Sequence, residues 1–585
     1  MNLLHDDVKL GLAQLLLDGL SEMGVQENLE TIYGQLGTVP SNQVGHVAFP
    51  MFTYAKALRS APPKLAVELV NKLAKSDLVA EVKPTGPYLN FVLSLAQLGN
   101  FVAKPILSGE FFKKKLTQDT PRTMVEYSQP NTHKEMHVGH MRNLALGNAL
   151  IRMHRYIGYD IVSCTFPGDV GTHVAKCLWY LKYHNKKSAP ETERGAWLGE
   201  MYVAGTLLLA ELEGTDEGAT AKVQMTAILK ELEAKEGEFF DLWKETRQWS
   251  IEQMEAVYDW ADVKFDEWYW ESDVDSASVA YVKEQHAKGM FQESEGAIGM
   301  DLSEDDLGFC LLLKSDGTGL YATKDVELAR RKFQVNGIER SVYIVDKRQE
   351  WHFKQVFKVL EKMGFEQAKD CFHLQYDYVE GKEGMFSSRL GNAVPVVDLI
   401  NKMTVAIRND YLEKSVTNGI MTAEEAEVIA PIVAQGAIKY GMVKIDPAKK
   451  IVFNMEEWIR ISGDSGPYQQ YTFARINSLC KKQDFDVNGP FDWSKLADDR
   501  EIELLLKAGR FNEVALAASQ SYKPSLLTNY LYDLAQLYNS LNNSVIIRDI
   551  TDPLEKNSRM AVHMVVAKVI ENGLSIMGIP VPAKM

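Results

Sequence analysis

Three histidines lie close together in the segment NTHKEMHVGHMRN, residues 131–143: His133, His137 and His140. On one continuous helix, spacings of four and three residues would place the three rings on one face. Such a cluster could bind a metal, fill polar positions in a core, or contact phosphate. Structural zinc needs four ligands, but this segment offers three histidines, a glycine among them and no cysteine. The composition of the segment therefore argues against a metal site.

The elements on either side place these histidines at the start of a helix. Residues 122–127, RTMVEY, have the pattern of a buried strand, and Pro130 prevents a helix from starting before Asn131. Beyond Gly139 the apolar residues recur at helical spacing, Gly158 ends the helix, and YDIVS begins another strand. Strand, turn, helix and strand form one βαβ unit, which implies a parallel sheet. The histidines thus straddle the turn into the helix and do not share one helical face.

A helix N-terminus supplies the chemistry that phosphate needs. Backbone N–H groups and the positive end of the helix dipole attract anions there. Gly139 has no Cβ and allows a phosphate or a flat ring to approach the backbone. His137 and His140 can donate hydrogen bonds to phosphate oxygens as charge builds in a transition state. A core role suits any single histidine, but it does not explain a pair that brackets a glycine. We therefore predict nucleotide phosphate handling.

Composition limits the remaining possibilities. A chain of 585 residues has room for about three or four domains. The net charge of −15 argues against indiscriminate nucleic-acid binding, although local basic patches such as Lys439, Lys444, Lys449 and Lys450 could bind one partner. The five cysteines are scattered, which favours reduced thiols, a cytoplasmic protein and no structural zinc. No apolar run is long enough to cross a membrane.

The order of the elements predicts an α/β nucleotide-binding domain with a parallel sheet. Residues 175–270 are mostly helical, acidic and rich in tryptophan, and strand-like runs return between GFCLLLK and FHLQYDYV. The simplest account is a sheet domain interrupted by a long helical insertion. From about residue 401 to the end we expect helices throughout.

Several motifs now resemble one family. HVGH resembles the HIGH signature of class I aminoacyl-tRNA synthetases, and VEYSQPNTHKEMHVGHMRN is similar to its arginyl-tRNA synthetase form. PTGPYLNF, LKSDGTGLYATKDVELA, YIVDKRQEWHFKQVF, SGDSGPYQQYTFARI, YLYDLAQLYNSL and MGIPVPAKM also resemble this family, in the same order. The resemblance spans nearly the whole chain and is closest to the bacterial type.

The resemblance implies a domain plan. We expect a Rossmann-like catalytic domain accompanied by an α+β N-terminal domain that binds the tRNA corner and an all-α C-terminal anticodon-binding domain. The expected ranges are 1–118 for the N-terminal domain, 119–400 for the catalytic domain with its insertion at about 180–270, 401–455 for a helical stem, and 456–585 for the anticodon-binding domain.

The resemblance also implies a reaction. The arginine carboxylate would attack the α-phosphorus of Mg²⁺-bound ATP, and the arginyl group would then pass to the 2′-hydroxyl of the terminal adenosine of tRNA(Arg). Arginine activation is expected to require bound tRNA. The implied partners are ATP, Mg²⁺, L-arginine and tRNA(Arg), with no zinc and no membrane, and we expect a monomer.

Arginine binding should use carboxylates in the plane of the guanidinium group. Glu126 ends the first strand, and Asp325 follows Tyr321 by one helical turn. These positions resemble the family's side-chain pocket, while Asn131 and Gln349 resemble its other substrate contacts. Taken singly, an acid at a strand end is more often solvated or capping, and the joint pattern favours the pocket.

The second class I signature, KMSKS, aligns with MFSSRLGN at residues 385–392. Ser387, Ser388 and Arg389 match the ATP-binding loop, but Met385 and Leu390 stand where the family commonly has lysines. Some relatives that lack the loop lysine carry one just before HIGH, and Lys134 occupies that position. We expect Lys134 to supply the missing charge to ATP; the alternative is an ordinary surface lysine.

For tRNA binding, the resemblance suggests aromatic residues of the C-terminal domain that stack on anticodon bases. The predicted contacts are Tyr468, Tyr471 and Arg475, with Tyr530 and Tyr538 as further candidates, although tyrosines at such spacings are more often core residues. Two rival functions stay open at this point. One is a class I synthetase for cysteine or a large aliphatic amino acid, and the other is a catalytically silent tRNA-binding relative.

Overall fold

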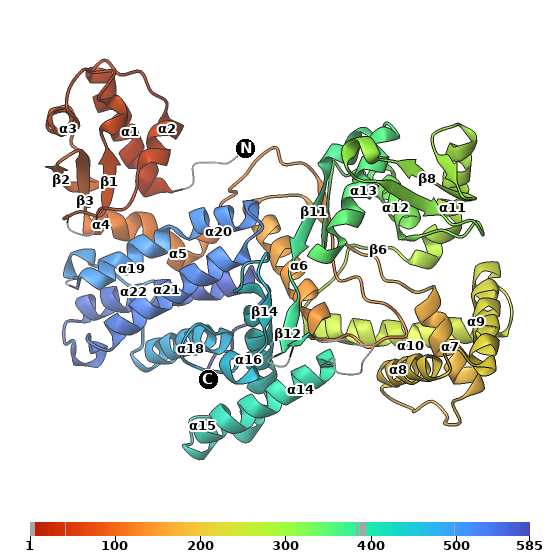
Figure 1. Cartoon of the computed structure of the whole chain (residues 1–585). Coiled ribbons are helices and arrows are strands. Elements are labelled where there is room, and N and C mark those ends of the chain that lie inside the picture. Colours follow the sequence, from red (N-terminus) through yellow and green to blue (C-terminus); the bar gives the residue numbers. More distant parts are fainter. Residues whose placement is uncertain (1–5, 41–42, 382–383, 386–393, 497) are drawn as a thin grey trace.

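The structure is a computed structural model that describes residues 6–40, 43–381, 384–385, 394–496 and 498–585. Figure 1 shows the N-terminal elements, drawn in red, beside the blue C-terminal helices, so the two ends of the sequence meet in space. Lys9 and Glu513 form an ion pair of 2.5 Å across this contact. No helix of the described residues is long and apolar enough to cross a bilayer.

The N-terminal part is α+β, as predicted. Three helices pack against an antiparallel sheet with the strand order β1-β3-β2. The helices are α1 (Asp7–Glu22), α2 (Leu29–Gln35) and α3 (Pro62–Val70), and the strands are β1 (Val47–Pro50), β2 (Val79–Thr85) and β3 (Tyr88–Leu93). The Thr-Gly-Pro segment turns the chain between β2 and β3, where Gly86 has a φ of +57°. Helices α4 (Leu95–Leu98) and α5 (Lys104–Ser108) lead to the next domain.

The central sheet is parallel and has the order β11-β10-β4-β5-β6. Its strands are β4 (Thr123–Glu126), β5 (Ile161–Thr165), β6 (Glu267–Trp268), β10 (Arg340–Asp346) and β11 (Cys371–Tyr376). Helix α6 (Val138–Ile157) joins β4 to the adjacent parallel strand β5, so the predicted βαβ unit is confirmed. The α/β class with a parallel sheet is likewise confirmed.

The side chains on the two faces of β4 pack against different helices. Met124 packs with Phe333 of α12 (Tyr321–Asn336), whereas Val125 packs in the core on the α6 side. Because side chains alternate along a strand, Glu126 lies on the α12 face with Met124. This alternation brings Glu126 to the same face as the helix that carries Asp325.

Helices fill the chain between β5 and β6. These are α7 (Thr172–Tyr183), α8 (Arg194–Glu211), α9 (Asp216–Ala234) and α10 (Glu238–Trp260), at the lower right of Figure 1. Helix α11 (Glu271–Ala287) then leads to a separate antiparallel sheet of β7 (Gln292–Ser294), β8 (Ala297–Asp301) and β9 (Phe309–Leu313). The strand-like run GFCLLLK therefore belongs to β9 of this small sheet and not to the parallel sheet.

After β10 the chain is mainly helical, apart from β11 of the parallel sheet and three short strands. The elements are α13 (Glu350–Lys362), β12 (Val379–Gly381), β13 (Gly384–Met385), α14 (Val396–Ile407), α15 (Glu413–Thr417), α16 (Ala423–Val443), β14 (Ile451–Val452), α17 (Met455–Trp458), α18 (Gly466–Lys482), α19 (Asp499–Gly509), α20 (Phe511–Gln520), α21 (Pro524–Asn542) and α22 (Pro553–Ser575). The expectation of helices throughout is wrong at β14, which pairs in parallel with β12. This pairing needs a distant partner strand and has no local sequence signal.

Candidate active site

His137 and His140 form a pair of hydrogen-bond donors at the start of α6. His137 is the N-cap residue, and its Nδ1 accepts a hydrogen bond of 3.1 Å from the Gly139 N–H. His140 Nδ1 accepts one of 3.0 Å from the His137 N–H. A backbone N–H only donates, so each Nδ1 lacks a proton and each Nε2 carries one. The ring centroids are 3.9 Å apart.

Both rings are neutral at physiological pH. Burial lowers the pKa of His137 to about 4, and it lowers the pKa of His140 well below the ordinary value. The Lys134 ammonium acts in the same direction on both. The pair therefore offers two N–H donors without a fixed charge. Gly139 is required by the His137 ring itself, because a Cβ at this position would lie 2.9 Å from its Cε1.

His133 has a different role from the other two histidines. It is fully buried, and its Nδ1 and Nε2 lie 2.9 Å and 2.8 Å from the hydroxyls of Thr132 and Thr246. Its backbone N–H donates to Ser250 Oγ. Burial lowers the pKa of His133 to about 3, and the ring is neutral. Since Thr246 and Ser250 lie on α10, His133 fastens the helical segment to the sheet and takes no part in the donor pair.

The predicted arginine-binding acids each have an internal basic partner. Glu126 is buried and accepts a hydrogen bond from the Nζ of Lys332, which is itself fully buried on α12. Asp325 Oδ2 lies 2.5 Å from His352 Nε2 in the first turn of α13. Burial opposes the charged form of His352, but Asp325 outweighs it and raises the pKa.

Asn131 lies beside a third buried acid. It bridges to Gly168, and a Cβ added to Gly168 would lie 2.4 Å from Asn131 Oδ1 and 3.6 Å from the carboxyl carbon of Glu271. Burial raises the pKa of Glu271 to about 7; the nearby Asp169 and Asp325 add to this shift, while Lys324 opposes it. Lys324 Nζ lies 3.4 Å from Glu271 Oε2. Glu271 is a buried acid beside the predicted contact Asn131, and the sequence analysis did not single it out.

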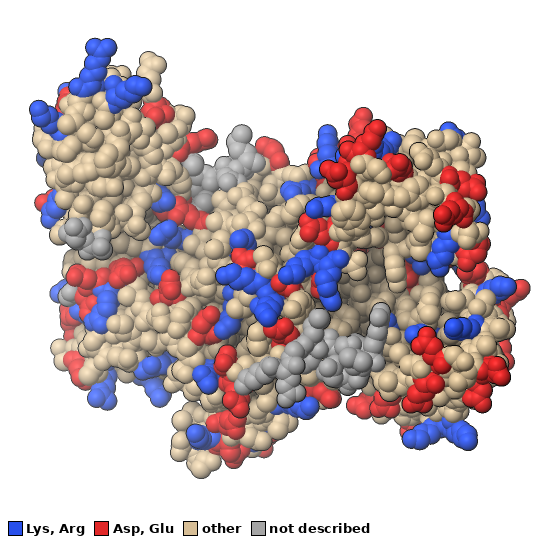
Figure 2. Space-filling view, viewed as in Figure 1, with Lys and Arg blue, Asp and Glu red and all other residues tan. Residues whose placement is uncertain are grey.

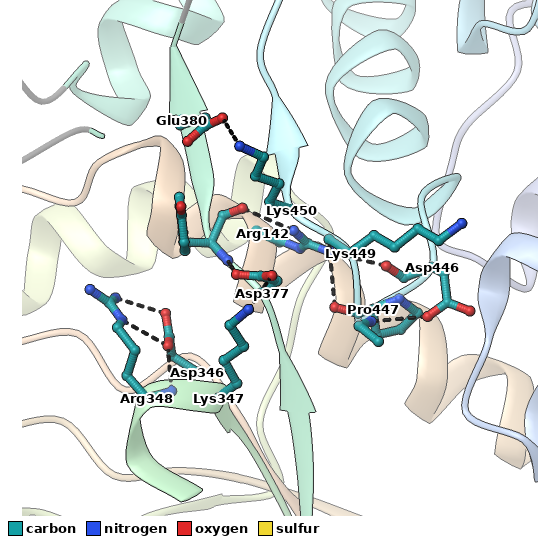
Figure 3. A network of polar contacts seen from close by, with 12 residues as sticks. Arg142, Asp346, Lys347, Arg348, Asp377, Glu380, Asp446, Pro447, Lys449 and Lys450 are labelled. Atoms are coloured by element: carbon teal, nitrogen blue, oxygen red, sulfur yellow. Dashed lines mark hydrogen bonds and ion pairs between the residues drawn. The ribbon is translucent and has the colours of Figure 1, made fainter. Parts of the chain in front are cut away.

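Arg142 joins α6 to two distant segments of the chain (Figure 3). Its guanidinium donates to the carbonyl oxygens of Tyr378, Asp446, Pro447 and Lys449 at 3.1, 3.4, 3.2 and 2.7 Å. Tyr378 directly precedes β12, and the other three lie in the loop before β14. At the start of α6, the Val138 N–H donates to Val394 O at 3.0 Å. The chain is therefore held against α6 on both sides of residues 386–393.

A cavity of about 380 Å³ lies beside the histidine pair. Its lining includes Lys134, Glu135, His137, Tyr202 and Pro395. The Lys134 ammonium lies 4.8 Å from the centroid of the Tyr202 ring, on α8. Lys134 thus lines the same cavity as His137. Figure 2 shows basic side chains gathered near the centre of one face, with acidic side chains among them, so the charges there are mixed.

Comparison with known proteins identifies the family. The family described as "tRNA synthetases class I (R), catalytic domain" matches residues 103–455, the "Arginyl tRNA synthetase N terminal domain" matches residues 11–93, and the "DALR anticodon binding domain" matches residues 469–585. The chain is 49% identical to an arginine–tRNA ligase of Bdellovibrio bacteriovorus, over 99% of this chain and 100% of the relative. The chain belongs to the class I arginyl-tRNA synthetases.

Other relatives agree over the full length. An arginine–tRNA ligase of Treponema denticola is 31% identical, over 98% of this chain and 99% of the relative. The arginyl-tRNA synthetase structure of Thermus thermophilus superposes with a TM-score of 0.78 at 26% identity, over 98% of this chain and 99% of that one. The predicted family is confirmed, and the rival assignment to a synthetase for cysteine or an aliphatic amino acid is excluded.

Of the remaining predicted substrate and ATP contacts of this arginyl-tRNA synthetase, two are described by the structure and three are not. Tyr321 begins α12 and is 70% exposed, and exposed Gln349 precedes α13. Ser387, Ser388 and Arg389 lie outside the described residues.

The predicted tRNA contacts lie on α18, where Tyr468 and Tyr471 are half-buried and Arg475 is exposed. Tyr530 and Tyr538 are buried, and the proposal that they stack on bases is wrong, because no base can reach a ring in the helical core.

A weak signal could have indicated Glu271. It directly follows the aromatic run WYW, just before a helix, but this pattern is also typical of an ordinary capping acid. The sequence did not indicate that Lys332 is buried, because a lysine at helical spacing is usually solvated. Both residues are brought to the site only by the packing of α11 and α12.

Proposed function

We propose that the residues at the start of α6 and those on β4, α11 and α12 activate L-arginine with Mg²⁺-bound ATP and transfer it to tRNA(Arg). The observation that carries this proposal is the neutral donor pair, His137 and His140, which begins the helix that follows β4, the strand that carries the buried acid Glu126. Phosphate needs N–H donors, and a guanidinium needs carboxylates. Both requirements are met along one edge of the sheet.

Arginine recognition is assigned to the carboxylate side of this site. Glu126 and Asp325 accept the guanidinium hydrogens, with the Tyr321 hydroxyl beside them, and Asn131 and Gln349 hold the α-amino end. Glu271, next to Asn131, belongs to the same wall. A site of this kind leaves buried carboxylates unpaired when citrulline enters, which can reject the wrong substrate by roughly 10⁴–10⁵. No editing domain is then required.

Adenylate formation is assigned to the donor side. A carboxylate oxygen of arginine attacks the α-phosphorus, the bond to the bridging oxygen breaks, and pyrophosphate leaves. The Nε2–H groups of His137 and His140 donate to phosphate oxygens as charge develops, and they need no change of protonation. In the second step a ribose hydroxyl of the tRNA attacks the activated carbonyl and AMP leaves. No protein nucleophile is involved, so positioning and charge stabilisation carry the rate.

Charge on the pyrophosphate is assigned to Lys134, together with Ser387, Ser388 and Arg389. Support comes from the position of Lys134 in the lining of the cavity that also contains His137. Its cationic contact with Tyr202 gives the ammonium a resting place on α8.

The tRNA is assigned to the two ends of the chain. In this proposal residues 1–118 bind the tRNA corner, the helical stem is 401–455, and residues 456–585 read the anticodon with Tyr468, Tyr471 and Arg475. The catalytic domain is 119–400, with its insertion at about 180–270. We place the enzyme in the cytoplasm as a monomer. Light scattering of the purified protein, which should give the monomer mass, tests the last point.

The deciding experiment is arginine-dependent exchange of pyrophosphate into ATP, with and without tRNA, with lysine and citrulline as controls. Exchange only with arginine and tRNA together is the expected result. Exchange without tRNA would keep arginine as the substrate but reject the coupling to tRNA. No exchange while tRNA still binds would favour the catalytically silent relative and overturn the proposal.

A further inference from the structure

Lys332 forms a buried ion pair that stability alone does not explain. Its side chain is 0% exposed and the Glu126 side chain is 5% exposed, and Lys332 Nζ donates to Glu126 Oε2. The ammonium also lies 4.0 Å from the centroid of the Tyr343 ring. Taking two charges out of water costs several kcal/mol per ion, so apolar residues would stabilise this core at least as well. The pair lies about two helical turns from Asp325 on the same helix.

The hydrogen bonds of Glu126 leave part of its acceptor capacity unused. Lys332 occupies one side of Oε2, and Gln129 Nε2 donates to Oε1 at 3.1 Å. Each carboxylate oxygen has two acceptor positions, so one on each oxygen is open to further donors. Glu126 is therefore held in one orientation and can still accept two hydrogen bonds from a planar guanidinium.

The surroundings add no further fixed charge. The described titratable groups that face this pair from β5, β10, β11 and the segment after β6 all have a pKa raised by burial: Cys164, Tyr343, Cys371 and Tyr269. They are neutral at physiological pH. Glu126 and Lys332 therefore cancel each other. The other acids of the predicted pocket are Asp325, beside His352, and Glu271, beside Lys324.

We propose that Lys332 is a specificity-determining positioning residue that holds Glu126 ionised and fixed, so that Glu126 can accept hydrogen bonds from a guanidinium without adding net charge to the pocket. Without Lys332, two buried carboxylates would face one substrate cation, and Glu126 would instead take up a proton. A protonated carboxyl group presents an O–H donor to a guanidinium that has only donors. The inference rests on the proposed function, because it requires Glu126 and Asp325 to receive the arginine side chain.

The test replaces Lys332 by the neutral, similarly long methionine. Pyrophosphate exchange between pH 6 and 9 gives KM for arginine and for ATP in a His352→Asn background, which removes the titration of His352. The same background with Lys332 intact is the reference for the titration of Glu271, whose pKa is about 7. For Lys332→Met we expect arginine KM to rise at least about tenfold at pH 7 and to recover as pH increases, with ATP KM unchanged. Arg331→Met is the matched control, since Arg331 is the next residue of α12 but pairs with Glu327 at 2.7 Å.

A double variant separates a role through Glu126 from a general packing role. Arginine KM of Glu126→Gln/Lys332→Met should not exceed that of Glu126→Gln, because Lys332 acts through this carboxylate. The double variant also removes both buried charges, so the test remains if Lys332→Met fails to fold. An unchanged arginine KM, a rise that is independent of pH, or additive effects would overturn the inference. Absence of exchange in the wild-type protein would instead refute the proposed function.

Discussion

The proposed phosphate end and the proposed arginine pocket of this enzyme are built in opposite ways. At the phosphate end, His137, Gly139 and His140 lie within four positions of the chain, and both rings are uncharged. The proposed pocket takes acids from β4, α11 and α12, and each acid contacts an internal basic side chain. Phosphate brings its own charge and needs only donors, which one helix start provides. A guanidinium needs buried anions, and buried anions need partners from distant segments.

The largest effect is expected from a variant that disrupts the proposed arginine pocket and leaves the phosphate end intact. In Asp325→Asn, kcat/KM for arginine should fall by roughly 10⁴, because the amide presents a donor to a cation that has only donors. ATP KM should not change. Pyrophosphate exchange measures both constants, and Asp275→Asn is the control, since Asp275 contacts Lys324 and not His352 and is 31% exposed. Near-normal kinetics in Asp325→Asn would remove this residue from the pocket.

The second largest effect is expected from a variant that disrupts the proposed phosphate end and leaves the arginine pocket intact. Asparagine is a good N-cap residue, so His137→Asn keeps the start of α6 while it removes the Nε2–H donor. The rate of adenylate formation should fall by about 10²–10³, which is the usual loss for one transition-state donor. Single-turnover kinetics and arginine titration test this together. A loss of arginine affinity with an unchanged rate would contradict the division between the two ends.

A smaller effect tests the role of Lys134, which lines the same cavity as His137. Lys134→Ala should slow adenylate formation by about tenfold, because the ammonium stabilises charge on the pyrophosphate. Tyr202→Leu, which removes the ring below Lys134 but keeps the ammonium, is the control and should act less strongly. If Lys134→Ala stays within about threefold of the wild-type rate, Lys134 is a surface lysine, as the alternative interpretation holds.

The smallest effect is a pH dependence confined to the pocket. The pKa of His352 is raised above 6.5 by Asp325, so below that pKa an imidazolium competes with the guanidinium for the same carboxylate. Arginine binding then releases a proton, and arginine KM should fall by roughly two- to fivefold as pH rises through the raised pKa. The neutral histidines of the phosphate end titrate far lower, and ATP KM should stay flat. In His352→Asn the change in arginine KM should become smaller, and in His352→Asn/Glu271→Gln, which also removes a group with a pKa of about 7, it should disappear. An unchanged pH dependence in His352→Asn would assign it to another group.

The sequence predicted the parts of this enzyme that depend on neighbouring residues. The βαβ unit follows from apolar periodicity with Pro130 and Gly158 as boundaries, and the donor pair follows from His137 and Gly139 at a helix start. The parallel sheet and the all-helical C-terminal half, apart from β14, followed from the same local patterns. Predictions of this kind succeed because capping and periodicity act within one or two turns of chain.

Only the tertiary structure decided which polar residues share a site. His133 differs from His137 because α10 supplies Thr246 and Ser250, not because of its spacing. Glu271, Lys324 and Lys332 join the pocket through the packing of α11 and α12, and Arg142 reaches carbonyls more than two hundred residues away. Buried charge must be balanced in space, and the chain can supply the balancing charge from any distance in sequence. Pairing of this kind leaves no local pattern to detect.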